Sequence, residues 1–147
     1  DPLERIVSAY YEVLRGHRPE NIYNTVADKK FILLNNEPDR FECLLDEIAE
    51  YGFFDGHLKP QAYFVTDDAG NEVEIDNYLF FETITQDFSK FCARRGQHFI
   101  LPNMNSFAKM YKKELVLWAR NNKRVSKKFN DLYGADVRLY LEKSPSS

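Results

Sequence analysis

Cysteine is scarce in this sequence, with two residues, Cys43 and Cys92, among 147. Two thiols cannot build the dense disulfide framework of small secreted domains. Both lie in stretches with helical spacing, so we expect buried free thiols and a cytoplasmic, reducing environment. Histidine is equally sparse: His17, His57 and His98 have no second histidine or cysteine at ligand spacing. We therefore expect no structural zinc.

Long apolar runs and catalytic motifs are also missing. No run approaches the roughly eighteen residues that span a bilayer, and the start of the chain does not resemble a signal peptide. The motifs G-x-x-x-x-G-K-[ST], G-x-G-x-x-G, H-E-x-x-H and G-x-S-x-G do not occur. Cys92 could be paired with His98 as nucleophile and base, but its place in an apolar stripe favours a structural thiol. We expect no membrane partner, cofactor, metal or catalytic residue, and a non-catalytic function is favoured over an enzyme.

Aromatic residues and charges are what the sequence has in abundance. Twelve Phe and nine Tyr are enough to form a core and argue against disorder over most of the length. Residues 1–76 carry seven Lys/Arg and seventeen Asp/Glu, whereas residues 77–147 carry thirteen and six. We predict a single domain, residues 1–147, with an acidic and a basic half. Either the halves pack together through opposite charges, or they meet different partners.

Apolar residues recur at intervals of three and four in four segments, which predicts amphipathic helices at about residues 2–15, 39–51, 83–95 and 103–119. Asp1 and Pro2 are typical of a helix start. Asp39 is the expected N-cap of the second helix. Thr83 and Gln86 have the spacing of a capping box at the start of the third.

Three segments predict strands. "KFILL" (30–34) is a short apolar run, and "QAYFVTDDAGNEVEID" (61–76) alternates on both sides of a glycine-bearing turn, as a β-hairpin does. The acidic turn lacks the spacing of a calcium loop, so a solvated turn is favoured. "DVRLYLE" (136–142) alternates as well. Together the segments predict an α+β domain, with amphipathic helices packed on a small antiparallel sheet.

The basic segment, residues 103–129, holds eight Lys/Arg against one Glu. The order helix, loop, helix, basic connection (119–134) and strand over residues 83–141 is that of a winged-helix module, whose second helix enters the major groove. We therefore predict a winged-helix-like C-terminal part that binds nucleic acid, DNA in the first place, through cations at phosphates and two polar residues near base edges. The predicted contacts are Asn105, Ser106, Lys109, Lys112, Lys113, Arg120, Lys123, Arg124, Lys127 and Lys128.

The stretch "DFSKFCARRGQHFILPNMNSFAKMYKK" (87–113) resembles the winged-helix segment that follows the helicase domain in phage and poxvirus D5-type replication proteins. Phe88, Phe91 and Cys92 match the first helix of that segment, and Ser106, Phe107 and Lys109 match the second. The ATPase motifs of the family are absent, and "SKKFNDLYG" (126–134) replaces its Gly/Arg-rich wing. The resemblance implies a DNA-binding module of replication or of a mobile element, and it leaves residues 1–82 unexplained.

Two other functions stay open. In the first, the acidic half docks a protein partner through exposed aromatics such as Tyr10, Tyr11, Tyr63 or Phe81, and the lysines serve solubility. In the second, an acidic strand face holds Mg²⁺ beside the basic helix. The placement of charge separates nucleic-acid binding from protein docking. A continuous cationic stripe supports nucleic acid, whereas cations neutralised by the N-terminal carboxylates support a protein-interaction module.

Overall fold

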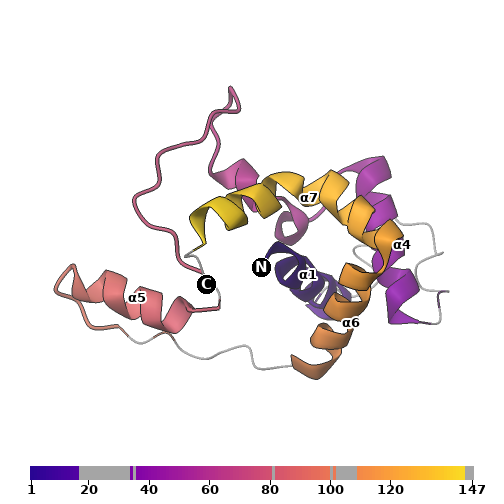
Figure 1. The fold of residues 1–147 in the computed structure, drawn as a ribbon, viewed down its shortest axis with the longest axis horizontal. Helices are drawn as coiled ribbons and strands as arrows, with labels where there is room; N and C mark the ends of the chain where they lie inside the picture. The colour runs from indigo at the N-terminus through magenta and orange to yellow at the C-terminus, as the bar shows by residue number, and fades with distance from the viewer. Residues whose placement is uncertain (17–33, 35, 81, 100, 102–108, 145–147) are drawn as a thin grey trace.

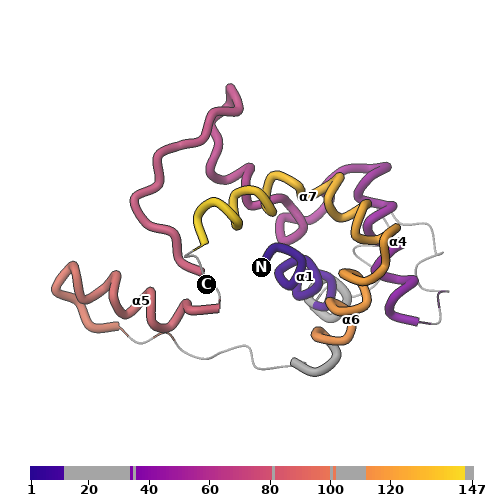
Figure 2. Tube along the Cα trace, viewed as in Figure 1, coloured from indigo at the N-terminus to yellow at the C-terminus, as the bar shows by residue number. Residues whose placement is uncertain are grey.

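The computed structural model describes residues 1–16, 34, 36–80, 82–99, 101 and 109–144. Its elements are α1 (Pro2–Gly16), α4 (Glu37–Tyr51), η1 (Gly56–Leu58), η2 (Gln61–Phe64), α5 (Ile84–Ala93), α6 (Lys109–Asn121) and α7 (Lys123–Lys143), where η marks a 3₁₀ turn. Helices α1, α4, α6 and α7 pack against one another, whereas α5 stands apart from them (Figure 1). The tube in Figure 2 follows residues 65–80 as a long loop that leaves the helical body and returns toward α5.

The predicted antiparallel sheet does not form in the described part of the chain, so the α+β prediction is wrong. The β pairing found there is one isolated bridge between Thr66 and Glu72. The turn between them does form, because Asp67 Oδ1 accepts hydrogen bonds from the backbone N–H groups of Ala69 (3.0 Å) and Asn71 (2.8 Å). The first strand cannot extend because residues 61–64 coil into η2. Of the segment 30–34, only Leu34 is described, and it is not in a strand.

The predicted strand at residues 136–142 is also wrong, and with it the winged-helix-like part, because these residues belong to α7. A seven-residue alternation is too short to distinguish the two periods, and the helical spacing of buried residues continues from Val125 through Phe129 to Tyr133. Asn122 begins this helix: its side-chain oxygen accepts from the N–H of Arg124 at 3.1 Å and of Val125. The predicted basic connection is therefore mostly helix.

The first three predicted helices are confirmed as α1, α4 and α5, and the fourth is confirmed as α6 from residue 109 onward, since its predicted start at 103–108 lies outside the described residues. Two of the predicted caps differ. Asn36 caps α4 instead of Asp39, since Asn36 Oδ1 accepts from the Asp39 N–H at 2.8 Å. The helix ends at Gly52, whose positive φ of 84° suits glycine and whose N–H donates to the Ile48 carbonyl. Thr83 makes no side-chain cap bond, so the predicted capping box is wrong.

One apolar core joins α1, α4, α6 and α7 with η1. Phe41 and Tyr10 are fully buried at its centre, with ring centroids 5.6 Å apart in an edge-to-face arrangement. Tyr11 is buried as well, so the prediction that Tyr10 and Tyr11 are exposed interface anchors is wrong. The other buried members are Leu3, Ile6, Val7, Ala9, Leu44, Leu45, Ile48, Leu58, Leu115, Val116, Ala119, Val125, Phe129 and Tyr133.

Asp136 is the polar centre that joins α7 to α1 and η2. Its side chain is 1% exposed. Its oxygens accept from Arg5 Nη2 (3.0 Å) and from the N–H groups of Gln61 (2.9 Å) and Ala62 (2.8 Å). Arg5 also donates to two backbone carbonyls, that of His57 within η1 and that of Lys59 directly after it. The carboxylate thus satisfies N–H groups at the start of η2 that would otherwise be unpaired in the interior.

Candidate functional site

The basic segment is spread over two helices in the structure. Lys112, Lys113 and Arg120 lie on α6, and Lys123, Arg124, Lys127 and Lys128 lie in the first two turns of α7. Lys109 is the first residue of α6, and Asn105 and Ser106 lie outside the described residues. Because Asn122 separates the two helices, no single recognition helix carries the whole set.

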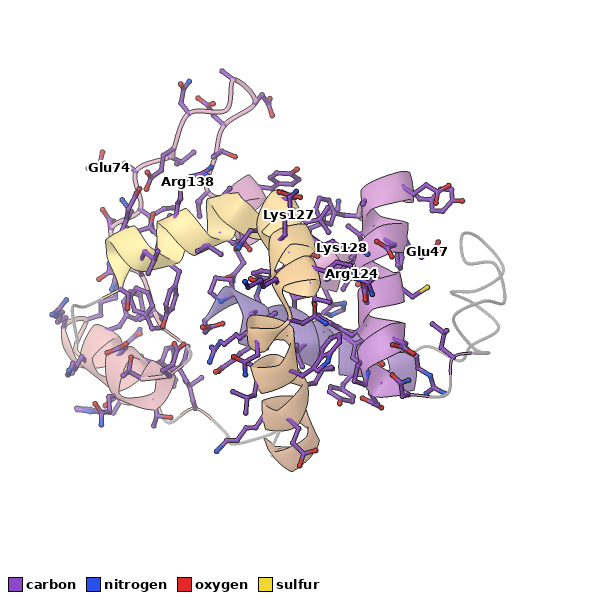
Figure 3. The ribbon with its side chains drawn as sticks, turned by 45° about the vertical axis from the view of Figure 1, so that its right-hand side comes forward. Glu47, Glu74, Arg124, Lys127, Lys128 and Arg138 are labelled. Carbon is purple, nitrogen blue, oxygen red and sulfur yellow. The ribbon has the colours of Figure 1, made fainter. Side chains whose placement is uncertain are left out.

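Two of these cations reach from α7 toward α4 (Figure 3). Lys128 Nζ lies 2.8 Å from Glu42 Oε1 and 2.5 Å from Asp46 Oδ1, and Arg124 Nη2 lies 2.5 Å from Glu42 Oε2. Burial acts to raise the pKa of Glu42, but hydrogen bonds from Lys128 and Arg124 outweigh it and hold this pKa below its ordinary value of 4.5. Against its own desolvation, Lys128 has a raised pKa because of Asp46 and Glu42. These charges are compensated within the chain.

We expect this cluster to make folding acid-sensitive. The folded pKa of Glu42 lies below the unfolded value near 4.5, so the stabilisation is present above that value and lost as the pH falls through the folded pKa. Urea unfolding should therefore show the largest destabilisation by Glu42→Gln above about pH 5 and a shrinking difference toward about pH 3. Glu50→Gln, an exposed site on the same helix, is the control. If the destabilisation by Glu42→Gln does not change with pH, the lowered pKa of Glu42 is not the source of acid sensitivity.

Some of the remaining cations of the predicted site form ion pairs, and others form none with the described residues. Arg120 Nη2 lies 2.7 Å from Asp1 Oδ2 and 3.5 Å from Glu4 Oε1, both on the acidic half. Lys127 Nζ lies 2.7 Å from Asp131 Oδ2 one turn along α7. Three further lysines of the predicted site, Lys112, Lys113 and Lys123, form no ion pair with any residue that the structure describes, and the side chain of Lys109 lies outside the description. Among the side chains that the structure describes, the unpaired part of the predicted cationic stripe is therefore reduced to these three.

An apolar hollow that the sequence interpretation missed lies between α1, α6 and α7. We call it the α1–α7 groove; its volume is about 210 Å³, and it is lined by Asp1, Pro2, Leu3, Ala119, Arg120, Ser126, Phe129, Asn130, Val137, Tyr140 and Leu141. Leu3, Ala119 and Phe129 are buried and belong to the core, whereas Leu141 is 70% exposed at the edge. The helical spacing of Phe129, Val137 and Leu141 could have indicated this surface, had residues 136–142 been assigned to a helix.

The described residues offer no metal site and no membrane span. No group of three or more His, Cys, Asp or Glu is placed to hold an ion among them, and none of the described helices has the length and apolar composition to cross a membrane. Cys92 is buried as predicted, whereas Cys43 is only half-buried. Comparisons of the chain with family models, with curated proteins and with solved structures find no match.

Proposed function

We propose that this chain is a non-catalytic protein-interaction module that binds an amphipathic helix in the α1–α7 groove. The observation that carries the proposal is an apolar surface left open beside a packed core, with Leu141 exposed at its edge. Such grooves accept the apolar face of a helix, which places side chains at i, i+3, i+4 and i+7. A cavity of about 150 Å³ holds benzene, so the 210 Å³ of this groove is sufficient for a large apolar side chain.

The pairing of charges supports protein docking over a polyanion site. Arg120, Arg124 and Lys128 are engaged by carboxylates from the acidic half. A phosphate that drew Arg124 and Lys128 away would leave the buried Glu42 carboxylate without partners, which costs free energy. The carboxylates in these ion pairs belong to the acidic half, so they are already bound within the chain. For this reason the apolar groove is a better docking surface than the acidic face that the sequence suggested.

A library of amphipathic helical peptides displayed on phage would test the proposal against the purified chain. We expect enrichment of peptides with apolar residues at i, i+3 or i+4, and i+7. Leu141→Asp should weaken the binding of a synthesised hit at least about tenfold, equivalent to about 1.4 kcal/mol, because it places a charge at the edge of the groove. Leu117→Asp is the matched control, since Leu117 is 61% exposed on α6 and does not line the groove.

Two outcomes would contradict the proposal. One is that no helical peptide is enriched, and the other is that Leu117→Asp weakens binding as much as Leu141→Asp. A circular dichroism spectrum of each variant shows whether the fold is kept. Both leucines are largely exposed, so neither substitution disturbs the core.

DNA binding is a second candidate function, supported by the three lysines without an ion pair in the described residues, Lys112, Lys113 and Lys123. Fluorescence anisotropy with labelled duplex and single-stranded DNA, from about 50 to 200 mM salt, tests it. Binding that falls steeply with salt and is lost in the Lys112→Glu, Lys113→Glu, Lys123→Glu triple variant would support it. Absence of binding at the lowest salt would dismiss it and leave the helix-binding proposal unaffected.

A further inference from the structure

The chain between the acidic turn and α5 is fixed to the last turn of α7. Lys143 Nζ lies 2.8 Å from Glu72 Oε1, and Tyr78 Oη donates to the same oxygen at 3.1 Å. The Lys143 ammonium also lies 5.6 Å from the centroid of the Tyr78 ring, within the range of a cation–π contact. The loop that leaves the helical body thus returns to it beside the C-terminal end of α7 (Figure 1).

A second group of contacts joins the same segment to a side chain of the α1–α7 groove. Tyr140 Oη donates to Glu82 Oε1 at 3.1 Å, and the Tyr140 ring packs edge-to-face on Phe80 with centroids 6.0 Å apart. The Glu82 carboxylate also meets the amino group of Asp1, another residue that lines the groove. Tyr140 therefore belongs both to the groove and to the contact with the loop.

We propose that residues 72–80 and Glu82 form a strap that fixes the Tyr140 ring and so regulates how tightly the α1–α7 groove binds its helical partner. The inference rests on the proposed function and adds a control element to the same site. A ring that is already held in one orientation loses little rotamer freedom when a partner arrives. The strap contacts therefore preorganise the groove, and their release weakens binding.

The strap is attached weakly enough to be released while the core stays folded. The side chains of Glu72 and Lys143 are 45% and 33% exposed, so water and salt screen their ion pair. Phe80 and Tyr140 are only half-buried, in contrast to the aromatic residues of the core. Segments with few buried contacts open at a small fraction of the global free energy of unfolding. A partner in the groove can therefore shift the attachment of the strap.

Coupling between two sites is reciprocal, so a partner in the groove should also tighten the strap. A glutamate-specific endopeptidase takes the carboxylate of Glu72 into its own pocket, so cleavage after Glu72 requires the pair with Lys143 to open. A bound helical peptide that lacks glutamate should slow this cleavage at least about twofold in the wild-type chain. In Phe80→Ala it should have no such effect. Equal cleavage rates of the wild-type chain with and without the peptide would overturn the coupling.

Fluorescence anisotropy with a labelled helical peptide from the phage library measures the effect of the strap on affinity. Phe80→Ala removes the ring that packs on Tyr140, and it should raise the dissociation constant at least about threefold. Leu79→Ala is the matched control and should leave the dissociation constant unchanged. Leu79 is 39% exposed and has no part in the ring contact or the hydrogen bond of Tyr140. Circular dichroism of each variant shows that the helical body is kept.

A charge reversal provides a second variant, in which Phe80 and the groove stay intact, because neither Glu72 nor Lys143 lines the groove. Glu72→Lys should weaken peptide binding through repulsion of Lys143. The double variant Glu72→Lys, Lys143→Glu should restore it, because the ion pair forms again in the opposite sense. If Phe80→Ala and Glu72→Lys both bind the peptide with wild-type affinity, the strap proposal fails and the helix-binding function stands. If no helical peptide binds the wild-type chain, both proposals fail.

Discussion

Replacing Asp136 with alanine is expected to lower the free energy of unfolding by about 3–5 kcal/mol, the usual cost of removing one partner from a buried ion pair. The variant leaves the Arg5 guanidinium without its carboxylate and leaves the N–H groups of Gln61 and Ala62 without an acceptor. Three elements, α1, α7 and η2, lose their common contact. Urea unfolding followed by Trp118 fluorescence and by circular dichroism would measure the loss.

Asp131→Ala is the matched control for this substitution. Asp131 lies on the same helix and pairs with Lys127, but both side chains are exposed, at 61% and 77%. An exposed pair at i, i+4 contributes about 0.3–0.5 kcal/mol, because water and salt screen it. Asp136→Asn should fall between the two, since one oxygen still accepts while the charge is gone. If Asp136→Ala and Asp131→Ala lower the free energy of unfolding equally, the hydrogen bonds of the buried Asp136 do not stabilise the fold more than an exposed ion pair does.

Phe41→Ala is expected to cost about 3–5 kcal/mol through lost burial and the cavity left behind. Phe41 is fully buried where α4 meets α1. Its edge-to-face contact with Tyr10 contributes about 0.5–1.5 kcal/mol beyond the area buried. The same urea experiment measures the change, and a lower thermal midpoint should accompany it.

Phe64→Ala removes the same phenyl ring as Phe41→Ala, but from an exposed position. Phe64 is 69% exposed at the end of η2, so its removal should change the free energy of unfolding by no more than about 0.5 kcal/mol. The difference between the two phenylalanines therefore reports burial alone. A loss at Phe64 comparable to that at Phe41 would mean that the core has been assigned to the wrong surface.

Local patterns predicted the helices well and the strands poorly, for a physical reason. Helical spacing extends over ten or more residues in α1, α4 and α5, and it can be recognised without knowing what packs against it. The alternation at residues 136–142 spans two turns of helix, where both periods fit. Packing decided between them, because the helical form places Asp136 against Arg5 and η2. This contact joins residues that are far apart in the sequence, so no local pattern indicates it.

The sequence by itself determined where the amphipathic helices lie, the acidic turn after Thr66, and the division into an acidic and a basic half. These features depend on side-chain chemistry and spacing over a few residues. Only the tertiary structure decided which cations are neutralised and which surfaces stay open. Glu42 meets Lys128 across 86 residues of sequence, and Ala62 meets Asp136 across 74. Such partners are brought together by the packing of a shared core, so charge patterning along the chain cannot reveal them.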